Sequence, residues 1–239
     1  MRGSYLARFM WAENKVEMLI QPSKQKVTAG QAVYTPGTLL VYDIVVLGIS
    51  NSFIWKCPSS RIEKHYNDNI SDSHLEVGVG TGYFPDRCKF PSEQPRVGLM
   101  DMNPNTLEFA SKRIARYEPD TYIQNILEPI DHELEPFDSI GINYLFHCVP
   151  GSISEKAVAF DHLKKLMKPG CKVFGSTILQ GGVPRSWAAR KLMDLYSKKG
   201  IFANDQDDLE GLESALAKRL ENVNIEVVGC VALFSGRCP

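Results

Sequence analysis

The sequence lacks the features that mark several large classes of protein. It has no run of about 20 apolar residues that could cross a bilayer, because the longest, from Thr38 to Ile49, is interrupted by Tyr42 and Asp43. None of its six cysteines forms a Cys-x-x-Cys pair, and no histidines cluster near them, which argues against a zinc site. With 27 Lys and Arg against 28 Asp and Glu, the chain offers no charge excess for binding nucleic acid or an anionic membrane.

What the sequence does contain is typical of a folded protein. Its 239 residues are 44% hydrophobic and 23% charged, and the length suits one domain with a modest extension. Arg8 and Glu13 interrupt the apolar residues of the N-terminal stretch, which predicts an amphipathic helix over Tyr5–Ile20 rather than a signal peptide. We therefore expect a cytoplasmic protein with reduced thiols.

The residue pattern divides the chain into two parts. Residues 1–70 predict a helical, aromatic-rich N-terminal extension, and residues 71–239 predict a second domain in which strands and helices alternate. The predicted strands are Ser73–Val77, Arg96–Met100, Thr121–Ile126, Phe137–Asn143, Cys171–Leu179, Val223–Val228 and Val231–Ser235. The predicted helices are Pro104–Tyr117, Ser152–Met167, Pro184–Lys198 and Asp207–Leu220.

Alternation of strands and helices predicts an α/β fold with a mostly parallel sheet. The last two predicted strands are joined at Gly229 by too few residues for a crossover helix, so they must pair antiparallel. The expected architecture is therefore a sheet of five parallel strands, extended at its edge by an antiparallel C-terminal hairpin.

A glycine-rich segment follows the first predicted strand. Gly78, Gly80 and Gly82 come directly after an apolar strand that carries Glu76 near its end. Glycines there let the backbone turn sharply and approach a ligand. The NAD fingerprint would place its third glycine at Tyr83, and no Gly-Lys-Ser/Thr follows as in a phosphate loop. The alternative interpretation is a glycine-rich turn without a ligand.

An acidic residue, Asp101, ends the second predicted strand. A carboxylate at this place can accept hydrogen bonds from both hydroxyls of a ribose. Alternatively, Asp101 stabilises the N-terminus of the helix that begins at Pro104. The two roles are compatible.

Four segments in this order resemble the motifs of class I S-adenosylmethionine-dependent methyltransferases, and the resemblance covers about residues 73–239. It implies a Rossmann-like, doubly wound, seven-stranded sheet that binds S-adenosylmethionine and releases S-adenosylhomocysteine. The segments are Leu75–Gly82, Val97–Pro104, Phe137–Asn143 and Leu166–Phe174.

The resemblance also implies a role for individual residues. Asp101 would bind the ribose, and Met102 would pack on the adenine. Asn125 and Ile126 would lie at the adenine edge, where the family commonly has an Asp. The methionine part of the cofactor would be held by Glu76, Gly78, Gly80, Gly82, Asn143 and Tyr144. The alternative for Asn143 is a residue of a strand-end turn.

The acceptor side is predicted from the aromatic residues and from one histidine. Tyr34, Tyr42 and Trp55 are predicted to form a lid that binds the substrate, with plain packing of helices on the sheet as the alternative. The family often uses the insertion around residues 186–208 for the acceptor pocket. His147, just after the fourth strand, is the candidate general base, and a structural histidine is the alternative.

The predicted function is methyl transfer from S-adenosylmethionine to a small-molecule acceptor in natural-product metabolism, without a metal ion. The protein would act as a monomer or homodimer and bind neither nucleic acid nor a membrane. An alternative is an enzyme of the same fold that has lost methyl transfer and acts as a cyclase, a pericyclase or a cofactor-bound scaffold. The glycine spacing and the closing hairpin disfavour an NAD-dependent oxidoreductase.

Overall fold

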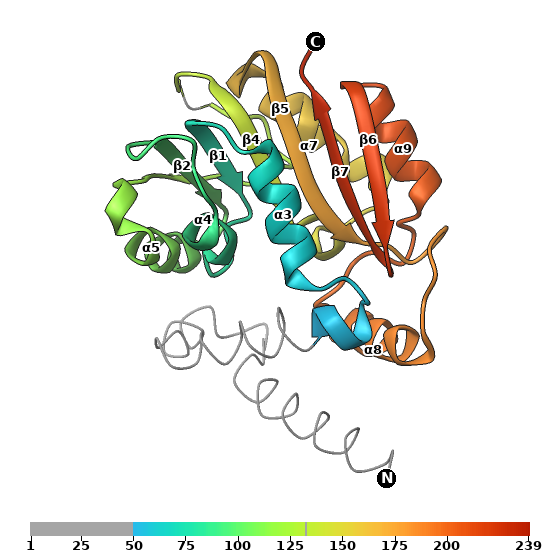
Figure 1. The fold of residues 1–239 in the computed structure, drawn as a ribbon. Coiled ribbons are helices and arrows are strands. Elements are labelled where there is room, and N and C mark those ends of the chain that lie inside the picture. Colours follow the sequence, from blue (N-terminus) through green and yellow to red (C-terminus); the bar gives the residue numbers. More distant parts are fainter. Residues whose placement is uncertain (1–49, 132) are drawn as a thin grey trace.

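The computed structural model describes residues 50–131 and 133–239, and its strands form one seven-stranded sheet. The strand order is β3-β2-β1-β4-β5-β7-β6, as Figure 1 shows in ribbon form. The first five strands are parallel, and β7 runs antiparallel to both β5 and β6. The predicted parallel sheet and its antiparallel hairpin are thus confirmed. The strands are β1 Ser73–Val77, β2 Arg96–Asp101, β3 Asp120–Ile123, β4 Phe137–Asn143, β5 Met167–Ile178, β6 Glu221–Val228 and β7 Val231–Arg237.

Helices cover both faces of this sheet, with short 3₁₀ turns (η) between them (Figure 1). They are α3 Ser59–Asn69, α4 Tyr83–Arg87, α5 Pro104–Arg113, η3 Ala115–Tyr117, η4 Phe146–Cys148, α6 Ile153–Lys156, α7 Val158–Leu163, η5 Lys164–Leu166, α8 Trp187–Lys198 and α9 Leu209–Ala217. Residues 50–54 form a single π-helical turn. None of the described helices is both long and apolar enough to cross a membrane.

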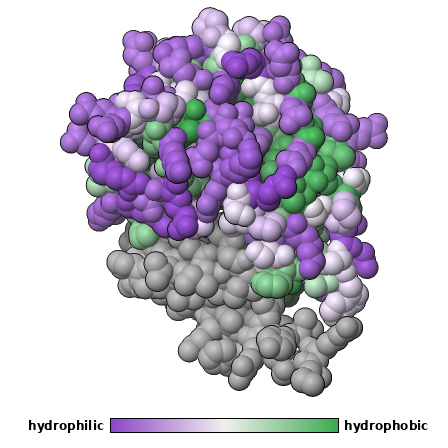
Figure 2. Space-filling view, in the orientation of Figure 1, coloured by the Kyte–Doolittle hydropathy of each residue, from purple (hydrophilic) through white to green (hydrophobic). Residues whose placement is uncertain are grey.

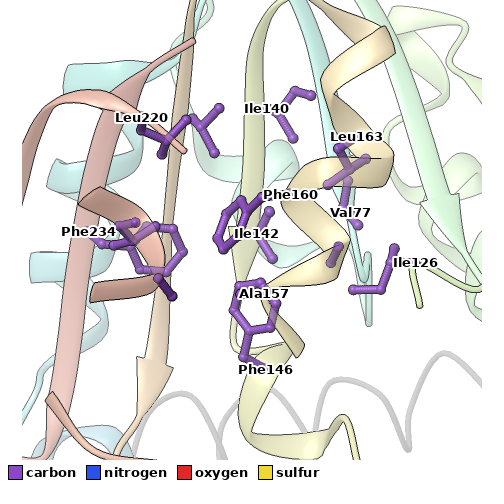
Figure 3. Close-up of a cluster of buried hydrophobic side chains, with 14 of the residues drawn as sticks. Val77, Ile126, Ile140, Ile142, Phe146, Ala157, Phe160, Leu163, Leu220 and Phe234 are labelled. Atoms are coloured by element: carbon purple, nitrogen blue, oxygen red, sulfur yellow. The ribbon is translucent and has the colours of Figure 1, made fainter. Parts of the chain in front are cut away.

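The two faces of the sheet bury separate sets of apolar side chains. On one face Ile140, Ile142 and Phe234 pack against residues of α6, α7 and α9, among them Phe160 (Figure 3). On the other face Phe174 packs against α3 and α8, with Trp55 in the same cluster. The alternation of side chains along each strand produces this division, because successive residues point to opposite faces. Figure 2 shows a largely hydrophilic outer surface on the side in view.

The closing turn between β6 and β7 requires a glycine. Gly229 has φ +62°, and a Cβ there would lie 2.1 Å from the carbonyl oxygen of Trp55. The same carbonyl accepts a hydrogen bond from the Cys230 backbone N–H at 3.0 Å. The segment before α3 is therefore attached directly to the C-terminal hairpin.

Several predicted boundaries were wrong. The helix predicted over Ser152–Met167 is broken into α6, α7 and η5, and β5 already begins at Met167. Ser152 is the N-cap of α6, with a capping box to Glu155. The helix breaks after Lys156, which is fully buried and bonds to the loop before α9. This long-range contact has no signature in local periodicity.

Some other helix and strand ends lie inside their predicted ranges, whereas β6 begins earlier, at Glu221, and β7 ends later, at Arg237. β3 ends at Ile123 rather than Ile126, and α5 ends at Arg113. Helix α8 begins after Ser186, whose hydroxyl accepts from the Ala189 N–H, and α9 begins after Asp208, which caps Gly211. Side-chain caps, and not the apolar pattern, set these two starts.

The predicted N-terminal extension lies mostly outside the described residues. This applies to the helix predicted over Tyr5–Ile20 and to Tyr34 and Tyr42. Of the predicted 1–70 unit, the described part is residues 50–70, and α3 packs against β5 and β7. The division at residue 70 stays a prediction.

Candidate cofactor and acceptor site

The glycine segment forms a tight loop between β1 and α4. Gly78, Gly80 and Gly82 all have positive φ, of +73°, +51° and +69°. The Gly78 N–H donates to the Met100 carbonyl at 2.8 Å, which holds the loop against β2. A Cβ on Gly80 would meet nothing within 4 Å, so the loop leaves open space on that side. Backbone N–H groups beside open space form a suitable cradle for a polar ligand.

Asp101 ends β2 beside this loop. Its carboxylate accepts from the Asn103 N–H at 2.9 Å. Burial raises its pKa above the usual value, and this effect is offset in part by Asn103, Thr106 and the backbone N–H groups of Val79 and Gly80. The carboxylate is thus partly desolvated and faces the glycine loop, as required of an acceptor for ribose hydroxyls.

Two apolar side chains beside Asp101 are exposed. Met102 is 68% exposed and Ile123 is 61% exposed. Ile123 is the register partner of Asp101 on the neighbouring strand β3. Exposed apolar side chains at the carboxyl ends of adjacent strands provide a surface on which a flat ring can pack. The sequence predicted Met102 for this role but not Ile123, because the predicted strand Thr121–Ile126 places Ile123 in its interior, whereas β3 ends at this residue.

The two residues predicted at the adenine edge have other partners. The Asn125 side chain accepts from the Leu127 N–H at 3.1 Å and donates to Glu128 at 3.0 Å, which closes a local turn. Ile126 is buried in the hydrophobic core, and its carbonyl bonds to the His162 ring. Their contact with a cofactor stays a prediction.

The end of β4 provides a buried donor without a partner. Asn143 is 6% exposed, and its side-chain oxygen accepts from the Ser176 hydroxyl at 3.0 Å. The amide nitrogen of the same side chain is buried and has no hydrogen-bond partner. An unsatisfied buried donor is costly, so this amide is a candidate to donate a hydrogen bond to a bound ligand. Tyr144 follows with φ +54° and donates its hydroxyl to Asn51 at 2.9 Å.

Glu76 lies two residues before the first loop glycine and is 2% exposed. Its carboxylate accepts from the Tyr66 hydroxyl at 2.9 Å, and the His74 ring lies 3.2 Å from the same oxygen. Sequence reasoning assigned Glu76 to the cofactor but gave no role to Tyr66, which comes from α3.

His147, the candidate base, is buried in η4. Burial and the nearby Lys156 lower its pKa to about 3. Its Nδ1 accepts from the Ile178 N–H at 3.5 Å, so the neutral ring carries its proton on Nε2. A ring with these properties is a weak base and a hydrogen-bond donor. Its role as a catalytic base stays a prediction, which the geometry argues against.

Aromatic rings surround His147. Phe202 lies 4.7 Å from it and Tyr144 5.4 Å, between ring centroids. Trp55 lies 5.8 Å from Phe202 and is 2% exposed. Contact of Trp55 with a substrate stays a prediction, and its burial favours the alternative of packing on the sheet.

A buried ion pair, absent from the sequence prediction, holds the loop that carries Phe202. Lys156 donates to Asp207 at 2.6 Å and to the Ala203 carbonyl at 2.8 Å. The Ala203 N–H in turn donates to the carbonyl of His147 at 2.8 Å. Loop 199–208, between α8 and α9, is therefore attached to His147 through its backbone.

The described residues contain no group of three His, Cys, Asp or Glu placed to hold a metal ion. All six cysteines are free. Burial raises the pKa of Cys57 and Cys230 to about 12, so these thiols are poor nucleophiles at neutral pH.

Comparison with known proteins agrees with this geometry. A family described as "Methyltransferase domain" matches residues 75–173. The chain is 39% identical over 210 residues to demethylluteothin O-methyltransferase of Streptomyces thioluteus, covering 88% of this chain and 91% of that protein. It is 32% identical over 220 residues to the physcion biosynthesis cluster O-methyltransferase of Aspergillus chevalieri, covering 91% and 99%.

Solved structures show the same fold. An O-methyltransferase family protein from Burkholderia thailandensis superposes with a TM-score of 0.62 at 14% identity, covering 98% of this chain and 70% of that one. The chain belongs to the class I S-adenosylmethionine-dependent methyltransferases. It is an enzyme that transfers the methyl group of S-adenosylmethionine to a small-molecule acceptor.

Proposed function

We propose that this enzyme methylates the oxygen of an acidic hydroxyl, an enol or a phenol, on a small apolar natural product. The similarity to demethylluteothin O-methyltransferase carries the proposal, because it extends over nearly the whole of both chains. The low pKa of His147 supports a narrower class of acceptors than the O-methyltransferase name of that relative implies.

The residues at the carboxyl ends of β1, β2 and β4 fit the cofactor. Asp101 would bind the ribose hydroxyls, and Met102 with Ile123 would support the adenine. The Gly80 backbone and the unpaired Asn143 amide would hold the methionine end. When bound, S-adenosylmethionine supplies a methyl group on a sulfonium, which is a strong electrophile.

The acceptor must then be aligned and, where it carries a proton, deprotonated. Positioning can contribute up to ~7–11 kcal/mol to lowering the barrier. A base with a pKa of about 3, as for His147, removes protons only from acidic groups. The acceptor would release its proton to water before the transfer, which an acidic enol does readily and a phenol, with a pKa of about 10, does in a small fraction of molecules. His147 would then donate a hydrogen bond from Nε2–H to the acceptor oxygen and orient it.

The proposed transfer needs no metal ion, because the enolate or phenolate is itself the nucleophile. Addition of a chelator should therefore leave the rate unchanged. We also propose that the enzyme works in the cytoplasm, as a monomer or a homodimer, as its sequence predicts.

The test is a panel of acceptors graded by acidity. Purified enzyme is incubated with methyl-¹³C-labelled S-adenosylmethionine and enols, phenols, aliphatic alcohols or amines. Mass spectrometry detects gain of a methyl group, and carbon NMR distinguishes a methoxy carbon from an N- or C-methyl carbon. We expect methoxy products from the enols and phenols alone, with the Asp101→Ala variant inactive.

Two outcomes would overturn the proposal. Methylation of nitrogen or carbon, or equal rates with aliphatic alcohols, would contradict the acidic hydroxyl. Conversion of an acceptor without methyl gain or release of S-adenosylhomocysteine would instead favour the alternative of a cyclase of the same fold.

A further inference from the structure

A chain of hydrogen bonds links α3, β1 and β4 to the Glu76 carboxylate. The Tyr66 hydroxyl donates to Glu76 at 2.9 Å and lies 2.9 Å from Nε2 of His74. On the other side of the ring, His74 Nδ1 lies 2.9 Å from the Ser139 hydroxyl. Ser139 accepts in turn from the backbone N–H of Ser71 at 3.0 Å.

The donors and acceptors of this chain fit together in one direction. Burial and the Glu76 charge raise the pKa of Tyr66 well above its usual value, so the phenol stays protonated. Its O–H donates a hydrogen bond to the carboxylate. The Tyr66 oxygen then accepts from His74 Nε2–H, and His74 Nδ1 accepts from the Ser139 hydroxyl. With this tautomer of His74, every hydrogen bond of the chain is directed toward Glu76.

The sheet is built around this arrangement. His74 and Glu76 point to the same face, opposite Ser139 and Gly141 on β4. A Cβ on Gly141 would lie 2.5 Å from the Glu76 carboxylate and 3.0 Å from the His74 ring, so only glycine fits there. Phe174 closes the site, with its ring 5.1 Å from Tyr66 and 5.7 Å from His74.

No Lys or Arg of the described residues pairs with Glu76, and its only ion-pair contact there is the His74 ring, at 3.2 Å. A buried carboxylate with no lysine or arginine beside it favours a cation from outside the protein. The cofactor carries one in the ammonium group of its methionine part.

We propose that Tyr66 and His74 are positioning residues that orient the Glu76 carboxylate for the ammonium of the cofactor. Helix α3 is thereby part of the cofactor site, although it precedes the glycine motif in the chain. The proposal goes beyond the proposed function and does not depend on the acceptor or on which atom is methylated.

Two ligands separate this role from a general effect on folding. S-adenosylhomocysteine carries the ammonium, whereas 5′-methylthioadenosine has the same adenosine and sulfur but no amino acid part. Dissociation constants of both are measured by calorimetry for the unaltered chain and for Tyr66→Phe, which removes a single hydroxyl. We expect Tyr66→Phe to weaken S-adenosylhomocysteine about tenfold, the scale of one hydrogen bond to a charged group, and to leave 5′-methylthioadenosine unchanged.

The matched control is Tyr83→Phe. Tyr83 also donates its hydroxyl to a glutamate of α3, Glu63, at 2.7 Å, but not to Glu76. This variant should bind both ligands as the unaltered chain does. In the enzyme assay, Tyr66→Phe should raise KM for S-adenosylmethionine while KM for the acceptor stays the same.

A second variant, Ser139→Ala, removes the donor to His74 at the far end of the chain of hydrogen bonds. It should show the same selective loss on a smaller scale, and it serves as the test if thermal unfolding shows that Tyr66→Phe does not fold. Equal weakening of both ligands in the folded variants, or no weakening of either, would overturn the proposal. Absence of O-methylation would not affect this outcome, because binding is measured without an acceptor.

Discussion

The two halves of the sheet's carboxyl edge differ in how they are built. The half proposed for the cofactor (the cofactor half) comprises the ends of β1, β2 and β3 with Asn143 of β4, and it is open at Met102, Ile123 and beside Gly80. The half proposed for the acceptor (the acceptor half) comprises η4, the end of β5 and loop 199–208, and it is closed, with His147 and Phe202 buried against each other. The open half relies on backbone geometry and the closed half on long-range packing.

Because of this difference, we expect substitutions in the two halves to act differently on the stability of the fold and on ligand binding. Residues of the cofactor half that face open space should affect ligand binding more than folding. Residues of the acceptor half are tied into the core and should affect folding first. Substitutions in each half can test this contrast.

The largest effect is expected in the acceptor half, from Lys156→Met. Lys156 and Asp207 are both fully buried, and one Asp207 oxygen already lacks a partner. Removing the lysine leaves an unpaired buried carboxylate, which should lower the free energy of unfolding by ~3–5 kcal/mol. Urea denaturation measures the loss.

The control is Lys165→Met on the exposed side of η5, which should leave stability unchanged. The double variant Lys156→Met with Asp207→Leu should recover part of the loss, because no charge then remains buried. A loss below about 1 kcal/mol for Lys156→Met, the scale of a surface ion pair, would contradict the closed character of this half.

The second-largest effect is expected in the cofactor half, where Asp101→Asn should weaken ligand binding. Loss of a charged acceptor for the ribose should weaken S-adenosylhomocysteine by at least about 30-fold, or ~2 kcal/mol. Stability should not fall, because burial raises the pKa of Asp101 and its ionisation at neutral pH therefore opposes folding. Calorimetry and urea denaturation at pH 7 give the two quantities.

The pH dependence of stability follows from the direction of the Asp101 pKa shift. The raised pKa means that the folded chain binds the Asp101 proton more tightly than the unfolded chain. The contribution of Asp101 to stability thus improves as the pH falls through its raised pKa toward 3.8, and the Asn variant lacks this gain. The exposed Asp138, paired with Lys168, provides the control Asp138→Asn, which should change neither binding nor stability. A stability loss in Asp101→Asn equal to that of Lys156→Met would remove the contrast.

The third test compares two glycines of one loop. Both Gly78 and Gly80 have positive φ, so alanine at either position costs ~1–2 kcal/mol of backbone strain. A Cβ on Gly78 would also lie 2.8 Å from Leu145, whereas a Cβ on Gly80 would point into open space. Gly78→Ala should therefore be the less stable variant in thermal unfolding.

For binding, Gly80→Ala should weaken S-adenosylhomocysteine beyond what its strain explains, because the new methyl group takes up space proposed for the cofactor. Equal affinities in Gly80→Ala and the unaltered chain would mean that the open space beside Gly80 is not the cofactor site.

The same contrast explains what could be predicted from sequence. The succession of strands and helices along the chain, the glycine loop and the place of Asp101 were predicted because each depends on local signals. These signals are apolar runs, glycine spacing and an acid at a strand end. Strands β1, β2 and β4 were placed within a residue of their observed ends. The cofactor half could therefore be predicted largely from residues that are close together in the chain.

The acceptor half could not be predicted in this way. His147 was chosen for its place after β4, but its burial depends on Phe202 and Lys156, which are distant in sequence. Tyr66 was missed for the same reason, because its partner Glu76 lies on another element and the tyrosine occurs in an ordinary amphipathic helix. Periodicity shows that a side chain is buried but not which polar atom it meets.

The last test is His147→Gln, which decides how closed the acceptor half is. The pKa of His147 is lowered from 6.5 to about 3, so the unfolded chain binds a proton there that the folded chain does not. The stability contribution of His147 is present above pH 6.5 and is lost as the pH falls toward 3. The slope is up to about 1.4 kcal/mol per pH unit. Urea denaturation at several pH values should therefore show a smaller loss of stability in acid for His147→Gln.

His162→Gln, at a partly exposed histidine of α7, is the matched control. A different result would contradict the closed site. If the pH–rate profile of the unaltered enzyme had an inflection between pH 6 and 7 that His147→Gln lacked, the ring would titrate in an accessible site. His147 would then act as the base that its place in the sequence predicts.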